Sequence, residues 1–202
     1  MDYRDRAKSL GSLAAIGMGS YLNTVTGNDE PEEARVVQAT ADLFETLRIA
    51  PAIGTTFTIE EQPEGGEGKV VISHGFWQRW FGGDPAAVGQ SLTVDGEPLT
   101  AMGVMPAGFR FLYDTDLWRP PWPGNSDPGT RLYTNWLSVG RLAEGFSLDE
   151  ARSEVEVIGN QLRDAYPTIN ENRALQLDEL HSVMVEGARG RLLLLTGAVV
   201  VL

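Results

Sequence analysis

The sequence predicts an α+β fold in which a mostly β module interrupts an α/β host. Residues 69–119 combine a short β-branched run, an aromatic helix and a hairpin pattern. Loops rich in glycine and proline bracket this stretch, at residues 62–68 and 120–129. The chain after the second loop has the pattern of a strand, a long helix and a further strand, which is the order of a βαβ unit. We therefore expect the host to be built from both chain ends.

Length and composition exclude several classes of protein. The 202 residues suffice for one large domain or two small intertwined ones, and 42% apolar with 22% charged residues is typical of a folded chain. The net charge of −12, with only 16 Lys and Arg, argues against a nucleic-acid partner and against docking on anionic lipid. Because the chain has no cysteine, disulfides, thiolate metal sites and cysteine nucleophiles are excluded.

The first fifty residues predict a helix, a hairpin and a second helix. Apolar residues at helical spacing favour a short amphipathic helix over residues 2–13, namely Tyr3, Ala7, Leu10 and Ala14. A low-charge stretch, a polar turn and a β-branched stretch then predict a hairpin over residues 14–40. Asp42 is expected to cap a helix that runs to Leu47, with Glu45 completing a capping box.

The central stretch has the clearest helix caps, helix ends and turns in the chain. A β-branched strand ends at Ser73, a natural helix N-cap. Four aromatic residues follow at spacings that gather them on one side of a short helix: Phe76, Trp77, Trp80 and Phe81. Glycines end this helix, and Pro85 is expected to open a further turn. Residues 91–105 then read as a hairpin around a four-residue turn, Asp95 to Pro98.

The strongest local signal lies in the last third of the chain. A strand is expected over residues 135–142, followed by a capping box of Ser147 and Glu150 that opens a helix over residues 147–165. Its apolar residues step by three and four: Leu148, Ala151, Val155, Ile158, Leu162 and Ala165. A strand over residues 174–180 would complete the βαβ unit, with both strands in one sheet.

The chain closes on an uncharged run over residues 192–202. At about 1.5 Å per residue, eleven helical residues reach roughly half of a ~30 Å hydrocarbon core. Arg189 and Arg191, just before the run, suit a membrane interface. The start of a truncated transmembrane helix is therefore favoured over a buried terminal helix or strand. The opening residues are charged and do not resemble a signal peptide.

Few residues point to chemistry. The pair Ser73-His74 invites a nucleophile and base, but adjacent side chains rarely face each other, so a cap at Ser73 is the better interpretation. Asp114-Thr115-Asp116 resembles part of a calcium loop without its glycine and final glutamate, which favours a solvated turn. We therefore predict no catalytic, cofactor-binding or metal-binding residues.

The five tryptophans suggest the most plausible ligand surface. Trp118 and Trp122 lie among prolines rather than on a periodic element, so they are the ones expected to be exposed. They are our candidates for a ligand or partner surface, although tryptophans more often fill a core or the seam between two subdomains.

The central run reads VVISHGFWQRWFGGDPAAVGQSLTVDGEPLTAMGVMPAGFRF. It resembles the MacB-like periplasmic core domain of FtsX-like ABC transporter permeases, in particular a large acidobacterial-type subgroup. The resemblance extends upstream through ARVVQATADLFETLRIAPAIGTTF and downstream through NWLSVGRLAEGFSLDEARSEVEVIGNQL, and RLLLLTGAVVVL resembles the start of the second membrane helix. It thus covers nearly the whole chain.

The resemblance implies a porter-like subdomain made of residues 1–60 and 131–188, with a mostly β, Sabre-like subdomain of residues 61–130 inserted in it. Residues 191–202 would begin the truncated transmembrane helix. It also implies a non-catalytic, periplasmic domain without cofactors. Expected partners are the membrane helices and nucleotide-binding domain of the parent transporter, a second copy in a homodimer, and a periplasmic adaptor protein.

Three functions remain open on these grounds. The first is an ectodomain that couples ATP-driven motion of membrane helices to export or mechanotransmission, bending at the loops 62–68 and 120–129. The second is a module that binds a peptide, lipid or glycan through the tryptophan-rich centre. The third is a hydrolase using His74 or His181, for which no supporting constellation exists.

Overall fold

The computed structural model describes residues 2–27, 30–58, 68–121, 136–167 and 177–184. The chain divides into two compact units. The terminal unit comprises residues 1–11 and 142–202, and the central unit comprises residues 12–141. Each unit has its own core and is described by itself.

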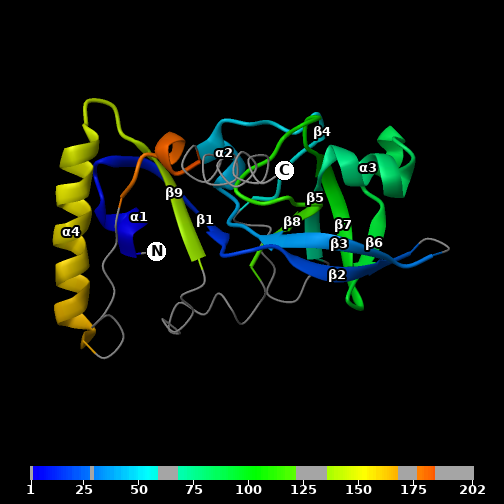
Figure 1. Cartoon of the computed structure of the whole chain (residues 1–202), viewed down its shortest axis with the longest axis horizontal. Coiled ribbons are helices and arrows are strands. Elements are labelled where there is room, and N and C mark those ends of the chain that lie inside the picture. The colour runs from blue at the N-terminus through cyan, green and yellow to red at the C-terminus, as the bar shows by residue number, and fades with distance from the viewer. Residues whose placement is uncertain (1, 28–29, 59–67, 122–135, 168–176, 185–202) are drawn as a thin grey trace, which may run out of the picture. The chain divides into compact units, whose positions relative to one another are not determined.

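A closed ring of six strands forms most of the central unit (Figure 1). The strands are β2 (Tyr21–Thr26), β3 (Glu32–Gln38), β5 (Gly68–Ile72), β6 (Ser91–Val94), β7 (Glu97–Val104) and β8 (Leu117–Arg119). Their order is β7-β5-β8-β3-β2-β6, and β6 pairs again with β7, which closes the ring. The short β4 (Ile53–Gly54) adds to the free part of β7. Closure leaves the ring strands without an open edge for most of their length.

Both predicted hairpins are present, with different bounds. The first spans residues 21–38 rather than 14–40, and the second has a shorter turn because Glu97 and Pro98 belong to β7. β2 and β3 pair antiparallel, as do β6 and β7 around the two-residue turn at Asp95 and Gly96. Both turn residues have positive φ, 47° and 84°, which suits this type of turn. Four long-range pairs complete the ring: β5 with β7 and β3 with β8 are parallel, and β5 with β8 and β2 with β6 are antiparallel.

The interior of the ring is one apolar core closed by helix α3 (His74–Phe81). Phe76 and Trp80 are buried in it and stack at 5.7 Å, while Trp77 and Phe81 pack against it partly exposed. The predicted aromatic face of this helix is therefore confirmed. The predicted turn at Pro85 is a 3-10 helix, η2 (Pro85–Ala87).

A second core covers the other side of the strands. It joins α2 (Leu43–Leu47) to Trp118, Phe57 and Phe111, and the rings of Phe44 and Trp118 meet edge to face at 6.1 Å. The predicted capping box at the start of α2 is wrong. Asp42 has helical backbone angles, and its side chain makes no capping hydrogen bond.

The helix predicted over residues 2–13 is shorter than expected. Helix α1 (Asp2–Arg6) is followed by strand β1 (Leu10–Gly17), which pairs with β9 (Trp136–Leu142) in a two-stranded sheet. Ala14 and Ile16 of β1 are buried in the second core. Leu10 and Ala14, two of the residues that suggested a helix, are four positions apart and therefore also fit the two-residue period of a strand. Sheet pairing decides between the two structures.

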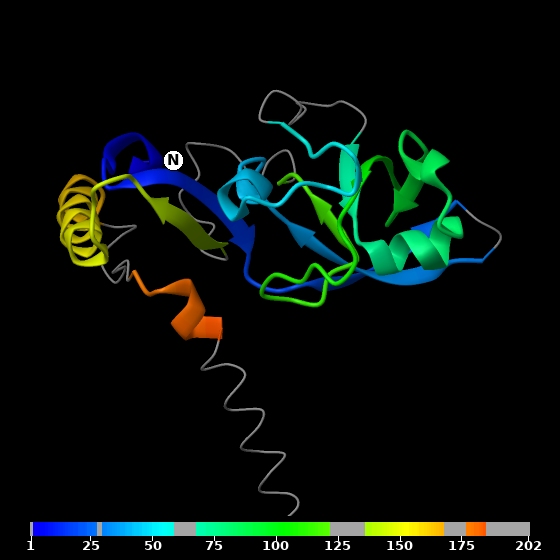
Figure 2. The same cartoon turned by 90° about the horizontal axis from the view of Figure 1, so that it is seen from above.

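Helix α4 (Leu148–Ala165) carries the terminal unit, and its predicted capping box is present. Ser147 Oγ accepts the Glu150 N–H, and Glu150 accepts the Ser147 N–H at 2.8 Å. Figure 2 shows α4 nearly end-on, with α1 beside it. Ala7, Ile158 and Leu162 form the small core between the two helices, with Tyr3 and Leu10 packed against it.

The strand expected over residues 174–180 is not found in the part of it that the structure describes. Residues 177–179 have no regular structure and residues 180–184 are helical; the rest of that segment lies outside the described residues. The expected transmembrane run at 191–202 also lies outside them. Among the described residues, no helix is long and apolar enough to span a membrane.

The boundaries of the two compact units lie at other positions than the subdomain boundaries expected at residues 60 and 130. Strands β2 and β3, which precede residue 60, share the closed ring with β5–β8, which follow it. The boundaries of the two units fall instead after residues 11 and 141. The porter-like and Sabre-like division remains a prediction.

Candidate functional site: a polar pocket beside helix α3

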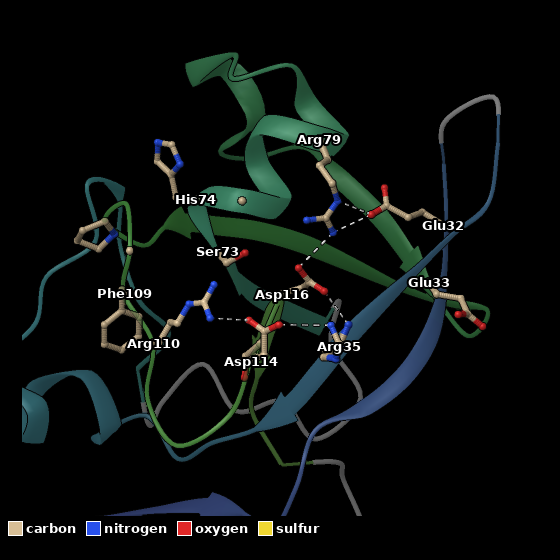
Figure 3. Close-up of a pocket in the computed structure, with 14 residues that line it drawn as sticks. Glu32, Glu33, Arg35, Ser73, His74, Arg79, Phe109, Arg110, Asp114 and Asp116 are labelled. Carbon is tan, nitrogen blue, oxygen red and sulfur yellow. Dashed lines mark hydrogen bonds and ion pairs between the residues drawn. The ribbon is translucent and has the colours of Figure 1, made fainter. Parts of the chain in front are cut away.

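A pocket of about 580 Å³ opens on the central unit beside the start of α3 (Figure 3). Three separate parts of the chain line it: the start of β3, helix α3 with its N-cap, and the loop of residues 106–116 that leads to β8. Its volume lies within the range of small-molecule sites, about 300–1,000 Å³. The lining is unusual for such a site because half of its residues are charged.

One group of charges holds the pocket wall together. Arg79 Nε donates to Glu32 Oε1 at 2.7 Å, and Arg79 Nη2 donates to Asp116 Oδ1 at 3.2 Å. Asp116 also accepts the backbone N–H of Arg35 at 2.9 Å. We call Glu32, Arg79 and Asp116 the wall network. It fastens α3 to β3 and to the loop before β8, and its short bonds mark it as structural.

The wall network also fixes the charge of Arg79. Partial burial lowers the pKa of its guanidinium, but the hydrogen bonds to Glu32 and Asp116 outweigh this effect, and the pKa is raised above its usual value. The guanidinium further lies 5.6 Å from the centre of the Phe76 ring. Arg79 is therefore permanently charged and has its partners within the protein.

A second group of charges at the pocket mouth is less tightly paired. Asp114 lies between Arg110 and Arg35, as Figure 3 shows. Its carboxylate is 3.5 Å from Arg35 Nη1 and 3.9 Å from Arg110 Nη1, and the second distance is beyond a hydrogen bond. We call Arg35, Arg110 and Asp114 the mouth triad. All three side chains are about half exposed or more.

The loop that carries Arg110 and Asp114 is held in one shape. Phe111 is buried in the second core, and the Tyr113 N–H donates to the Phe111 carbonyl at 2.7 Å, which makes a tight turn. Leu112, at the centre of that turn, has a φ of 60°, a region that side chains other than glycine rarely adopt. Such strain persists only where the surrounding packing imposes it. The backbone that carries Arg110 and Asp114 is therefore preorganised.

The structure places the sequence candidates differently from expectation. Trp118 is fully buried (0% exposed) in the second core, so the prediction that it is exposed is wrong, and the alternative of a core tryptophan holds. Its strand β8 lies between β3 and β5, and this central position buries it. Trp122 lies outside the described residues.

Two minor sequence interpretations are clarified. Ser73 is the N-cap of α3, and its Oγ accepts the Phe76 N–H at 3.1 Å, as predicted. Asp114 and Asp116, read as a solvated turn, in fact pair with arginines of the pocket. Within the described ranges, no cluster of three His, Asp or Glu residues could hold a metal ion. The arginines that meet these carboxylates come from distant parts of the sequence, and no local signal joins them.

Comparison with known families identifies the chain. A model of the MacB-like periplasmic core domain matches residues 2–158, more than three quarters of the sequence. This chain belongs to that family. It is therefore the periplasmic or extracellular domain of an ABC transporter permease of the MacB and FtsX type, and the family is a non-catalytic one. The resemblance read from the central aromatic run is confirmed.

Solved structures agree on the fold. This MacB-like domain is similar to the extracellular domain of the noncanonic ABC-type transporter YknZ from Gram-positive bacteria, with 18% identity, a TM-score of 0.61 and coverage of 83% of each chain. It is similar to the periplasmic region of MacB from Actinobacillus actinomycetemcomitans, with 12% identity and a TM-score of 0.59, over 84% of this chain and 74% of that one.

A domain of a putative permease from Porphyromonas gingivalis shows the same fold, with 14% identity and a TM-score of 0.58, over 92% of this chain and 83% of that one. No curated protein sequence matches this chain. At these identities the solved structures support the α+β fold of the MacB-like domain and do not assign its residues.

Proposed function

We propose that this domain couples ATP-driven movement of its transporter's membrane helices to work on the outer side of the membrane, as export or mechanotransmission. A domain that transmits such movement must hold its two chain ends together, because in a permease both ends lead to membrane helices. The observation that supports the proposal is the attachment of the N-terminal segment to α4 within the terminal unit.

This attachment rests on one carboxylate. Glu154 of α4 accepts the backbone N–H of Lys8 at 3.0 Å through Oε1 and that of Ser9 at 2.7 Å through Oε2. The Ser9 carbonyl in turn accepts the Ala143 N–H at 2.8 Å. A movement imposed on the first residues of the chain is thereby passed to α4 and to the strand before it.

Charge reinforces the attachment. Hydrogen bonds from Ser9 and Lys8 lower the pKa of the Glu154 carboxyl below its ordinary value, so the charged form is the one that holds the segment. The apolar contacts of Ala7 with Ile158 and Leu162 add to it. The loops at 62–68 and 120–129, expected to act as hinges, fall almost wholly outside the described residues.

The partners follow from the same proposal. The domain would work with the membrane helices and the nucleotide-binding domain of its transporter, as a homodimer, and with an adaptor protein on the outer side. Binding of a peptide, lipid or glycan by the tryptophan-rich centre remains the alternative. The burial of Trp118, one of its two predicted residues, disfavours it.

The experiment is to change Glu154→Ala in the full-length transporter and to measure transport and ATP hydrolysis together. We expect ATP hydrolysis to continue and transport per ATP to fall severalfold, because the N-terminal segment is released from α4. Glu156→Ala is the matched control, since Glu156 lies two residues further on the same helix and is exposed. Unchanged transport per ATP in Glu154→Ala would contradict the proposal.

A further inference from the structure

The mouth triad is a charged site that is only partly paired, because Arg35 Nη1 donates to Asp114 Oδ2 at 3.5 Å while Arg110 Nη1 stays 3.9 Å from Asp114 Oδ1. In the wall network below it, guanidinium and carboxylate meet at 2.7–3.2 Å. At the mouth, Arg110 and Asp114 lie side by side on the same loop at 3.9 Å, too far for a hydrogen bond. The short distances in the wall network show that guanidinium and carboxylate groups can pair closely in this pocket. The wall network is therefore structural, whereas the charges at the mouth are available to a ligand.

Two opposite charges held side by side are complementary to a ligand that carries the same two charges in reverse order. An ammonium group beside Asp114 and an oxyanion beside Arg110 would each form a charge-assisted hydrogen bond that the two residues do not give each other. Arg35, on the other side of Asp114, donates to Asp114 Oδ2, so the oxygen that faces Arg110 is Oδ1. A purely anionic ligand would meet Asp114, and a purely cationic one would meet the two arginines.

The surroundings of the triad suit a compact ligand of this kind. The pocket volume of about 580 Å³ exceeds what the triad alone needs, and Pro106 and Phe109 line it together with the start of α3. The strained turn at Leu112 holds Arg110 and Asp114 in place before any ligand arrives, which reduces the ordering cost of binding. The net charge of −12 disfavours simple anions as ligands of the chain as a whole.

We propose that this pocket binds a small zwitterion, in which an ammonium group and a carboxylate or phosphate lie close enough to engage Asp114 and Arg110 together. The site does not depend on the coupling role of the terminal unit, because all its residues belong to the central unit. Failure of one proposal therefore leaves the other standing.

The test is calorimetric titration of the full chain with two compact zwitterions, alanine and O-phosphoethanolamine, which distinguish an amino-acid source from a phospholipid-headgroup source. The matched probes, each of which lacks one charged group, are N-acetylalanine and alaninamide for the first and ethyl phosphate and ethanolamine for the second. We expect at least one zwitterion to bind, and its singly charged counterparts to bind at least about tenfold more weakly, since each lost contact is a charge-assisted one.

Variants inside and outside the pocket test whether the zwitterion binds at the mouth triad. Arg110→Gln and Asp114→Asn should each weaken the bound zwitterion at least about tenfold, while Arg6→Gln and Glu156→Gln, which remove one exposed charge of each sign outside the pocket, should leave it unchanged. Thermal melting checks that all four variants fold. Absence of binding by both zwitterions would overturn the proposal. So would binding that survives the loss of one ligand charge, or that survives both pocket variants.

Discussion

The central and terminal units are held together by different means. The central unit has two apolar cores on the two sides of its strands, with large side chains such as Phe44, Phe76 and Trp118 fully buried. The terminal unit has a core of Ala7, Ile158 and Leu162, supplemented by the hydrogen bonds of one exposed carboxylate. Its apolar contribution is therefore a small fraction of that of the central unit.

Charged groups show the same contrast. In the central unit, Arg119 is almost fully buried and pairs with Glu97 through two hydrogen bonds of 2.9 and 3.0 Å. This pair crosses strand β5 at Gly68, where a Cβ would lie 3.4 Å from the Glu97 carboxylate. In the terminal unit, Glu154 forms its hydrogen bonds at the surface. The central unit is therefore built as a rigid body, whereas the segments of the terminal unit are joined by contacts that solvent and pH can reach.

The largest expected effect on stability is in the central unit. Trp118→Ala should lower the free energy of unfolding by about 3–5 kcal/mol, because a fully buried indole leaves a cavity between the second core and the strands. Urea denaturation measures it. Val157→Ala, at a side chain that is 54% exposed, should change it by less than about 0.5 kcal/mol. Equal effects of the two variants would mean that Trp118 is not in the core.

A smaller effect is expected in the terminal unit. Leu162→Ala should cost about 2–3 kcal/mol, near the lower end for buried leucines, because its core is small and can collapse around the gap. Hydrogen exchange should show faster exchange in α4 while the amides of β5 and β7 remain protected. Gln161→Ala, one residue earlier and exposed, is the control. If Leu162→Ala lowered the protection from hydrogen exchange equally in α4 and in β5 and β7, the claim that the two units are held together by different means would be contradicted.

The smallest effect depends on pH. The pKa of Glu154 is lowered in the folded state by hydrogen bonds from Ser9 and Lys8, so its contribution to stability is present above the ordinary pKa of a glutamate. That contribution is lost as the pH falls through the lowered value. The difference in unfolding free energy between the unmodified chain and Glu154→Gln should therefore shrink between pH 7 and pH 3. A difference that stays constant, as for the exposed control Glu156→Gln, would contradict this role.

Local signals predicted the elements well. Ser73 and the Ser147–Glu150 pair are caps that a few neighbouring residues define, and both are present. The segment from Leu10 to Leu13 was wrongly predicted as part of a helix, because Leu10 and Ala14 fit both a four-residue and a two-residue period. Pairing with β9, more than a hundred residues away, makes it a strand.

The candidate site could not be read from the sequence. Arg35, Arg79 and Asp114 lie on three segments that only the ring of strands brings together. The same ring buries Trp118, which its proline-rich neighbourhood suggested was exposed. Membership of the family was predictable, because the aromatic run around α3 is a long contiguous pattern.

The most direct measurement tests whether the N-terminal segment and α4 move as one body. The chain has no cysteine, so the changes Ala7→Cys and Ile158→Cys introduce one pair across the small core, to be joined by oxidation or a short bismaleimide. In the full-length transporter carrying Glu154→Ala, we expect the crosslink to restore transport per ATP toward that of the unmodified protein. A crosslink that instead abolishes transport, in the unmodified background as well, would show that the two segments must separate during the cycle, and would contradict the account.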